Sequence, residues 1–148
     1  MPEITRQQLI LALIPAGANP RLAGVNLQEL DMTRLDLTGA NMRLAAMTAA
    51  RLRETVLRNA NLSFADLALA QLPGADLNQA NVQNVNFTSA NLQGANLAGS
   101  NMTNAKLNDA NLQGAIMTGA NVSGVTFNQN TVWPDGKVGN QASPGDYT

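Results

Sequence analysis

The most regular feature of the chain is an apolar residue at every fifth position. From Leu22 to Phe127 this position is apolar in all 22 repeats. At an apolar content of 45%, chance gives such a run with a probability on the order of 10⁻⁸. A period of five matches neither the 3.6-residue period of a helix nor the two-residue period of a strand. The pattern therefore predicts a chain that turns a corner in every repeat. The positions are Leu22, Leu27, Met32, Leu37, Met42, Met47, Leu52, Leu57, Leu62, Leu67, Leu72, Leu77, Val82, Phe87, Leu92, Leu97, Met102, Leu107, Leu112, Met117, Val122 and Phe127.

The residues just before these apolar positions are also restricted. Two residues before, 14 of the 22 are Ala, and one residue before, ten are Asn and four are Asp. One large and one small inward residue per repeat indicate an interior filled by the large side chain, with the small one where backbones crowd. A single repeat cannot bury its apolar side, so successive repeats must stack. We expect the Asn and Asp side chains to bond along the stack or to the turn backbone.

The pattern weakens in two places. Between residues 45 and 59, Asn and Asp are replaced by Ala46, Arg51 and Val56, and the stretch 47–59 taken alone is compatible with a helix. The apolar fifth position continues through this stretch, so we assign it to the stacked repeats. Near the start, bulky side chains occupy the small position, which fits a wider or capped first coil. They are Val25, Leu30 and Leu35.

The repeat carries a resemblance. Segments such as 60–64 (ANLSF) and 95–99 (ANLAG) have the pattern A-(D/N)-L-x-x, which resembles the pentapeptide-repeat family. The resemblance covers residues 20–129. It implies an all-β fold, a right-handed quadrilateral β-helix with four repeats per coil, and therefore about 5.5 coils in a rod roughly 26 Å long at ~4.8 Å per stacked strand. The segments 12–27 and 127–136 are similar to the entry and exit segments of bacterial, notably cyanobacterial, members.

Both ends of such a rod need caps, because open ends expose backbone edges and apolar interior. Thr5 and Gln8 have the spacing of a capping box, and apolar residues follow at helical spacing. The sequence predicts a short helix over residues 5–14 that lies across the first coil and ends at Pro15. At the other end we expect Trp133 and its neighbour Val132 to cover the last coil.

The chain is accordingly divided into three parts. Residues 1–19 form the N-terminal capping helix, residues 20–134 the β-helix with its C-terminal cap, and residues 135–148 a flexible tail. The tail assignment follows from its Gly, Ser, Pro and Asn content.

Composition removes several kinds of chemistry. The chain has no Cys and no His, so it lacks thiol nucleophiles, disulfides, imidazole bases and the two commonest zinc ligands. Four aspartates occupy the position of the Asn row, which favours a structural role over acid–base work. They are Asp31, Asp36, Asp66 and Asp76. We therefore expect a protein that is not an enzyme and that binds no metal or cofactor.

The charge pattern points to a protein partner. The net charge is −1, and charged residues are only 13% of the chain. A nucleic-acid binder is normally basic and a DNA mimic acidic, so we expect no nucleic acid as partner. The oligomeric state that we expect is a monomer or a weak homodimer.

Charged residues concentrate on one predicted face. With four repeats per coil, residues 20 apart stack, so Arg34, Arg51 and Arg53 share a face and Arg58 flanks it on the next. The same geometry places Arg34 against Glu54, and Arg51 against the aspartate 20 residues earlier. Two interpretations stay open: surface ion pairs of little energetic weight, or a partner-binding patch with a small positive excess.

Two apolar residues are also predicted to face outward. Leu44 and Phe64 are 20 residues apart at an outward repeat position and should touch. Adjacent exposed apolar side chains mark an interface, unless a corner or loop of the chain covers them.

We interpret the chain as a non-catalytic protein-binding or scaffold module. The alternative is a protective DNA mimic that binds a topoisomerase such as DNA gyrase, which the balanced charge and the unbroken repeat disfavour. We expect a cytoplasmic location. The apolar run 9–16 is too short to span a bilayer, and the small residues 16–18 after it resemble a signal-peptide cleavage site. The thylakoid lumen or periplasm is therefore the alternative compartment.

Overall fold

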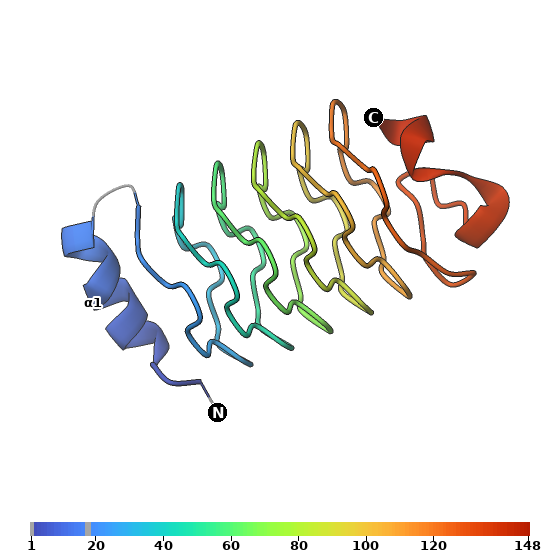
Figure 1. Cartoon of the computed structure of the whole chain (residues 1–148). Coiled ribbons are helices and arrows are strands. Elements are labelled where there is room, and N and C mark those ends of the chain that lie inside the picture. Colours follow the sequence, from blue (N-terminus) through green and yellow to red (C-terminus); the bar gives the residue numbers. More distant parts are fainter. Residues whose placement is uncertain (1, 17–18) are drawn as a thin grey trace.

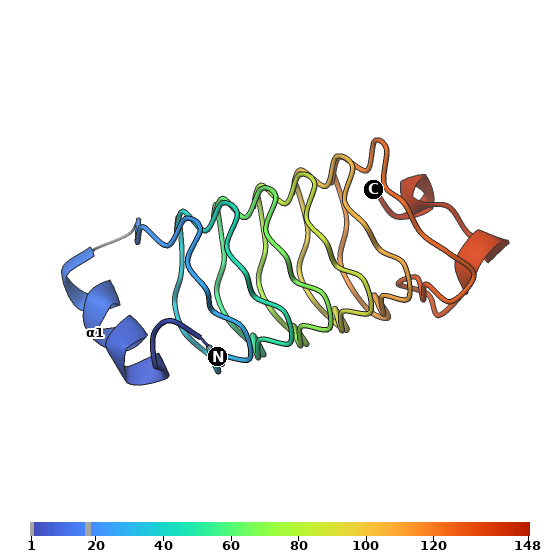
Figure 2. The same ribbon diagram turned by 60° about the horizontal axis from the view of Figure 1, so that its bottom comes forward.

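The chain forms a rod of stacked coils, as the computed structural model shows (Figure 1). The structure describes residues 2–16 and 19–148. One helix, α1 (Arg6–Ala16), lies at the N-terminal end of the rod, and a folded C-terminal segment lies at the other. The view in Figure 2 shows the coils stacked along the same axis.

Each coil contains 20 residues. Parallel bridges join each residue before the large apolar position to the residue 20 positions later, from Arg21–Asn41 to Lys106–Thr126. These are isolated bridges, because the chain turns in every repeat and no straight segment is long enough for a longer ladder. In the described residues the β structure therefore consists of single parallel bridges between coils and one antiparallel bridge, Val132–Val138, within the C-terminal segment; the parallel bridges make the fold a repeat β-helix.

The interior of the rod consists of the two predicted inward rows. The large apolar side chains are fully buried through the middle of the rod, for example at Leu52, Leu72 and Phe87, and so are most of the small residues two positions before them. Burial is less complete at the ends, where Val25 and Val122 are only partly covered. The stretch 45–59 belongs to the coils and contains no helix.

Two polar side chains replace Ala in the buried small row. Thr55 Oγ1 donates a hydrogen bond to Met32 O at 2.8 Å in the preceding coil. Ser100 is also buried, but its hydroxyl has no hydrogen-bond partner among the described residues.

The corners of the coil have a backbone conformation that the sequence analysis did not anticipate. Every fifth residue from Gly24 to Gly124 has a positive φ, and at 13 of these corners the residue is not glycine, with φ between 54° and 62°. In each repeat the residue after the corner donates its N–H to the large apolar residue, as Ala75 N does to Leu72 O at 3.1 Å. A positive φ at the third residue of such a turn is the type II pattern.

The Asn and Asp row makes both kinds of hydrogen bond expected of it. Asp66 Oδ1, for example, accepts from the N–H of Ala68 at 3.1 Å. The same oxygen accepts from Asn86 Nδ2 at 2.9 Å in the next coil. The side chains thus hold the turn locally and join neighbouring coils.

The helix α1 covers the first coil. Thr5 N donates to Gln8 Oε1 at 2.7 Å and Gln8 N donates to Thr5 Oγ1 at 3.2 Å, which is a capping box. The helix begins one residue later than the predicted segment 5–14 and continues through Pro15 to Ala16. Helix ends commonly shift by one or two residues. The small-residue site of the signal-peptide alternative includes residues 17 and 18, which lie outside the described residues.

Arg6 closes the exposed carbonyl edge of the first coil, a role that the sequence did not suggest. Its Nη1 donates to Asp31 O at 2.6 Å and its Nη2 donates to Thr33 O at 2.8 Å. In each later coil, the carbonyl 20 residues further along accepts a hydrogen bond from a backbone N–H of the preceding coil. Arg51 O, for example, accepts from Met32 N at 2.7 Å. The guanidinium therefore takes the place of a missing coil.

The C-terminal segment packs around Trp133, whose side chain is fully buried. Its indole Nε1 donates to Gly139 O at 2.7 Å. The ring lies edge-on to Phe127 at 5.0 Å and stacks on Tyr147 at 6.0 Å between centroids. Two short 3-10 helices, η1 (Gly139–Gln141) and η2 (Pro144–Tyr147), complete the segment. Residues 135–148 are thus folded against the cap in this structure, and the flexibility expected of them stays a prediction about their motion.

Candidate functional site

The four candidate arginines all form ion pairs within the chain. Arg34 Nε lies 2.6 Å from Glu54 Oε2, and Arg53 Nε lies 3.1 Å from Glu54 Oε1. Arg51 Nε lies 3.9 Å from Asp31 Oδ2, and Arg58 pairs with a carboxylate on the next coil, Asp76. The two predicted stacked pairs therefore form, and the positive excess of this face is smaller than the arginines alone would give.

The carboxylates of these pairs respond to their neighbours. Hydrogen bonds from Arg34 and then Arg53 lower the pKa of Glu54 below its usual value. The pKa of Asp31 is lowered first by hydrogen bonds from Thr33 and then by the charges of Arg6 and Arg51. The groups in the pairs of Glu54 and Asp31 are well exposed, so solvent screens the attraction and these pairs add little to stability. Asp76, which pairs with Arg58, is more covered, with 18% of its side chain exposed.

Three large apolar side chains are exposed at corners of two adjacent coils. Leu44 and Phe64 have exposed fractions of 53% and 48%, and Leu69 has 55%. Leu44 and Phe64 occupy one corner in successive coils, as predicted, and no loop covers them. Leu69 lies at the following corner of the same coil as Phe64. We call these three residues the apolar patch.

Short side chains lie between the two corners of the patch. Ala46 lies between them in one coil, and Asp66 and Ala68 lie between them in the next, while Ala49 occupies the corner of Leu69 one coil earlier; all four are partly exposed. Leu69 was not predicted from the sequence, because a spacing of 20 residues relates only side chains at one corner. The signal was present, since Leu69 has the same position within its repeat as Leu44 and Phe64.

A cation without a carboxylate partner adjoins the patch. The Cζ atom of Arg43 lies 5.4 Å from the centroid of the Phe64 ring, within the range of a cation–π interaction. Among residues 2–16 and 19–148, neither Arg43 nor Arg21 on the same side of the rod lies within salt-bridge distance of a carboxylate. In this half of the rod, these arginines rather than the four predicted ones are therefore available to bind an external anion.

The C-terminal half of the rod offers a different surface. Between residues 77 and 134 the only charged residues are Lys106 and Asp109. Two asparagines, Asn128 and Asn130, donate to Asp109 Oδ1 at 3.1 and 2.7 Å, and their hydrogen bonds lower the pKa of this carboxyl. The rest of this surface is neutral and mostly polar, apart from Ile116, whose exposed fraction is 52%.

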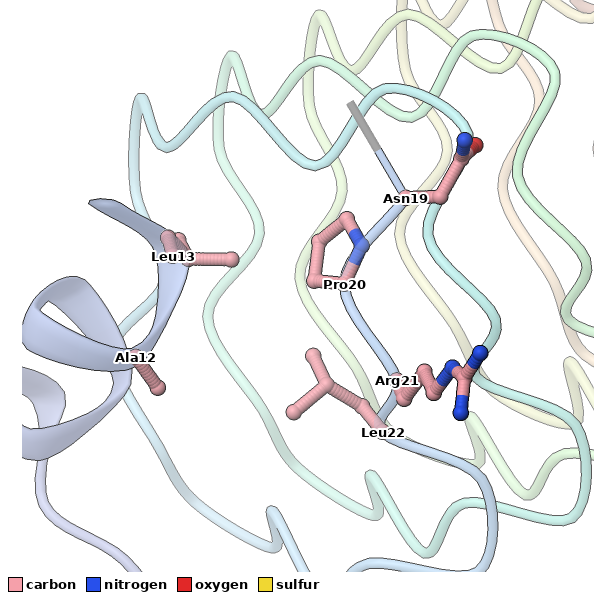
Figure 3. Close-up of a pocket in the computed structure, with 6 residues that line it drawn as sticks. All are labelled: Ala12, Leu13, Asn19, Pro20, Arg21 and Leu22. Atoms are coloured by element: carbon pink, nitrogen blue, oxygen red, sulfur yellow. The ribbon is translucent and has the colours of Figure 1, made fainter. Parts of the chain in front are cut away.

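A pocket of about 330 Å³ opens between α1 and the first coil. It is lined by Ala12, Leu13, Asn19, Pro20, Arg21 and Leu22 (Figure 3). Its lining is mainly apolar and brings together no set of side chains suited to acid–base chemistry. It lies where the chain enters the first coil from α1.

In the described part of the chain, no three His, Cys, Asp or Glu side chains gather closely enough to hold a metal ion. No helix of that part is long and apolar enough to cross a membrane.

Comparisons with known proteins agree with the repeat. The family model for pentapeptide repeats matches with eight copies over residues 21–53, 50–88 and 90–129. No curated protein matches the chain.

Solved structures resemble the chain to different degrees. A pentapeptide-repeat protein of the Arabidopsis thaliana thylakoid lumen is 35% identical, with 64% of this chain and 68% of that chain covered and a TM-score of 0.54. HetL, involved in heterocyst differentiation regulation in the cyanobacterium Nostoc, is 31% identical, with coverage of 80% and 61% and a TM-score of 0.40. QnrB1, a plasmid-mediated fluoroquinolone resistance protein, is 20% identical, with coverage of 76% and 65% and a TM-score of 0.34.

Proposed function

Because the chain belongs to the pentapeptide-repeat family, we propose that it is a non-catalytic module that binds another protein through the side of its rod. The scaffold that we propose is a right-handed quadrilateral of about 5.5 coils closed at one end by α1. Bridges between residues 20 apart support four repeats per coil. No cofactor or metal takes part in this function.

The observation that carries the proposal is the apolar patch. Leu44 and Phe64 are exposed at one corner of two adjacent coils and Leu69 at the next corner, and no other large apolar side chain of these two coils is exposed. Aromatic and aliphatic anchors beside an arginine are the composition typical of the centre of protein interfaces. Because about half of each of these three side chains remains exposed, they contribute little to the stability of the rod.

The patch also indicates the chemistry of its partner. Phe64 and its two aliphatic neighbours fit apolar side chains, and Arg43 beside the ring is free to pair with a carboxylate. We therefore propose a partner segment that presents apolar residues next to an acidic one. Desolvation of the ring and the guanidinium on binding strengthens their interaction with each other and with the carboxylate.

The paired arginines have a secondary role in the proposed binding. Arg34, Arg51, Arg53 and Arg58 lie on the neighbouring faces and can contact a large partner at its rim. An acidic partner there must compete with the carboxylates that already hold them. Rim charges of this kind affect the association rate more than the affinity.

A quantitative pull-down from native lysate tests the site. Phe64→Ser should lose the captured partner, whereas Asn84→Ser should retain it. The control is closely matched, because Asn84 occupies the same corner one coil later and has a similar backbone φ, 56° against 62° at Phe64. Arg51→Glu combined with Arg53→Glu should weaken capture only in part. Equal capture by wild type and Phe64→Ser would remove the patch as the binding site.

No surface feature of the described residues supports the alternative function, a DNA mimic that binds a topoisomerase. Such a protein requires an extended acidic surface, and the exposed charges of this rod are mostly paired and balanced. A gyrase supercoiling assay with and without a quinolone should show no effect of the protein. Protection of the enzyme would replace our proposal by this alternative.

We propose the cytoplasm as the compartment, with the thylakoid lumen or periplasm as the alternative. The relative from a thylakoid lumen supports keeping the alternative. Fractionation of source cells followed by immunoblotting decides between them.

A further inference from the structure

Neighbouring coils are joined by a fixed set of backbone hydrogen bonds. On the face that contains the last repeat at residues 120–124, Met102 N donates to Asn121 O at 2.8 Å. In return Asn121 N donates to Ser100 O at 2.9 Å. The large apolar residue thus offers its N–H, and the small residue its carbonyl, to the coil that follows.

The repeat at 120–124 has the same groups on its far side, without partners. The N–H groups of Val122 and Gly124 and the carbonyl of Ala120 correspond by repeat to the groups that join the preceding coils. None of the three has a hydrogen-bond partner in residues 2–16 or 19–148. Val122 is only partly buried, whereas Val82 in the same row is fully buried. We call the segment 120–124 the edge strand.

The C-terminal cap continues the coil on a different face. Val132 O accepts from Leu112 N at 2.8 Å, and Val132 N donates to Ala110 O at 2.9 Å. The repeat at 110–114 therefore has a next layer. The edge strand lies two repeats further along the chain, on the opposite face of the 20-residue coil, and has no such layer among the described residues.

We propose that the edge strand binds an extended peptide segment of a partner protein, added as one more strand of the rod. Unpaired strand edges are templates for a strand from another chain. The edge strand continues the interface between coils, because its two N–H groups and its carbonyl are the groups that bind the next strand in every earlier coil. This surface lies apart from the apolar patch, so the proposal does not depend on the function proposed for that patch.

The geometry also specifies the segment. In each earlier coil the strand added at this face has a small residue, a polar residue and an apolar residue in succession, such as 100–102 (SNM). The backbone N–H of the polar residue donates to the carbonyl of the small residue in the preceding coil. The carbonyl of the polar residue accepts from the N–H of the large apolar residue in that preceding coil. A partner segment of this pattern places its N–H on Ala120 O and its apolar side chain over Val122.

A titration of the full, isotope-labelled chain tests the proposal. The probe is a capped synthetic peptide with the sequence of residues 99–105 (GSNMTNA), followed by amide shifts and hydrogen exchange. We expect saturating shifts and slowed exchange at Val122 and Gly124. The same peptide with an N-methyl group on its first Asn lacks the donor for Ala120 O and should bind about tenfold more weakly, as for the loss of one hydrogen bond.

A matched pair of variants tests the same edge from the side of the protein. Val122→Pro removes an N–H that has no partner, so melting should change little while peptide binding is lost. Val82→Pro removes an N–H that donates to Asn101 O at 2.9 Å, so melting should fall sharply. If Val122→Pro does not fold, the comparison of the two peptides on the unmodified chain decides alone.

Three results would overturn the proposal. The first is the absence of shifts at Val122 and Gly124 up to saturating peptide. The second is equal binding of the N-methylated peptide. The third is a dependence of these shifts on the concentration of the protein alone, because a second copy of the chain would then occupy the edge.

Discussion

Replacement of a single inward leucine measures how far the stacked interior holds this rod together. Leu72 is fully buried, while Leu69, three residues earlier in the same coil, has an exposed fraction of 55%. Leu→Ala at each site removes the same atoms from opposite sides of one backbone. The comparison therefore isolates burial from changes in composition.

The magnitude follows from the surroundings of each side chain. Leu72→Ala keeps the backbone bonds from Leu72 N to Asn91 O at 2.7 Å and from Ala75 N to Leu72 O at 3.1 Å. The loss is then the transfer and cavity cost of a buried leucine, about 2–5 kcal/mol of unfolding free energy. Leu69→Ala should change it by less than about 0.5 kcal/mol, as for other exposed sites.

Urea unfolding and thermal melting, both followed by far-ultraviolet circular dichroism, give the two values. A loss of about 3 kcal/mol raises the unfolding equilibrium constant by roughly two powers of ten and lowers the melting temperature by about 6–12 °C. Equal losses for the two variants, or a loss below about 1 kcal/mol at Leu72, would refute the assignment of this row to a close-packed interior. Repeat proteins can unfold in parts, so the urea curve must also be recorded by Trp133 fluorescence. The free energies are valid if this curve coincides with the one from circular dichroism.

Three further outcomes are expected from polar and terminal groups. Ser100→Ala should leave the free energy of unfolding unchanged or raise it by about 1 kcal/mol, because it removes a buried hydroxyl without a partner. Thr55→Val loses the hydrogen bond to Met32 O and should lower the free energy of unfolding. Urea unfolding of both variants checks the comparison. Arg6→Ala should cost about 1–2 kcal/mol by uncovering two edge carbonyls, which thermal melting checks against Arg21→Ala, a change expected to be neutral. Burial and then the hydrogen bond to Asp135 raise the pKa of Tyr147 to about 12, so the stabilisation from the protonated phenol is complete below about pH 10 and is lost as the pH rises toward 12. The phenolate absorbance of this single tyrosine should titrate near pH 12, and Asp135→Asn should move the midpoint down; a midpoint near 10 in the unmodified protein would mean that Tyr147 does not pack on the cap.

The interior of the fold follows from the sequence because burial repeats with a simple period. An apolar residue at every fifth position and a small one two residues before it identify both inward rows, including the stretch 45–59 where the Asn row fails. The stacked pairs of Arg34 with Glu54 and of Arg51 with Asp31 follow from the same arithmetic. These features depend only on which residues share a row.

Other features depend on geometry that the period does not contain. The positive φ at corners such as Phe64 follows from the type of turn, and the residues there range from Gly to Leu. The role of Arg6 depends on the angle at which α1 meets the first coil, and the packing of Tyr147 on Trp133 depends on the path of the C-terminal segment. Among the candidate residues, Leu44 and Phe64 are exposed as expected, while Leu69 and Arg43 emerge only when neighbouring corners and faces are viewed together.

The constant 20-residue coil has a consequence for insertions and deletions. Removal of one pentapeptide, such as residues 95–99, preserves both inward rows, so the shortened chain should still stack. Everything that follows the deletion would, however, advance by one face. The edge strand and the cap would rotate by a quarter turn relative to Leu44 and Phe64. Removal of a whole coil of 20 residues would shorten the rod and keep that alignment, so the length of this protein can change freely only in steps of four repeats if two of its surfaces act together.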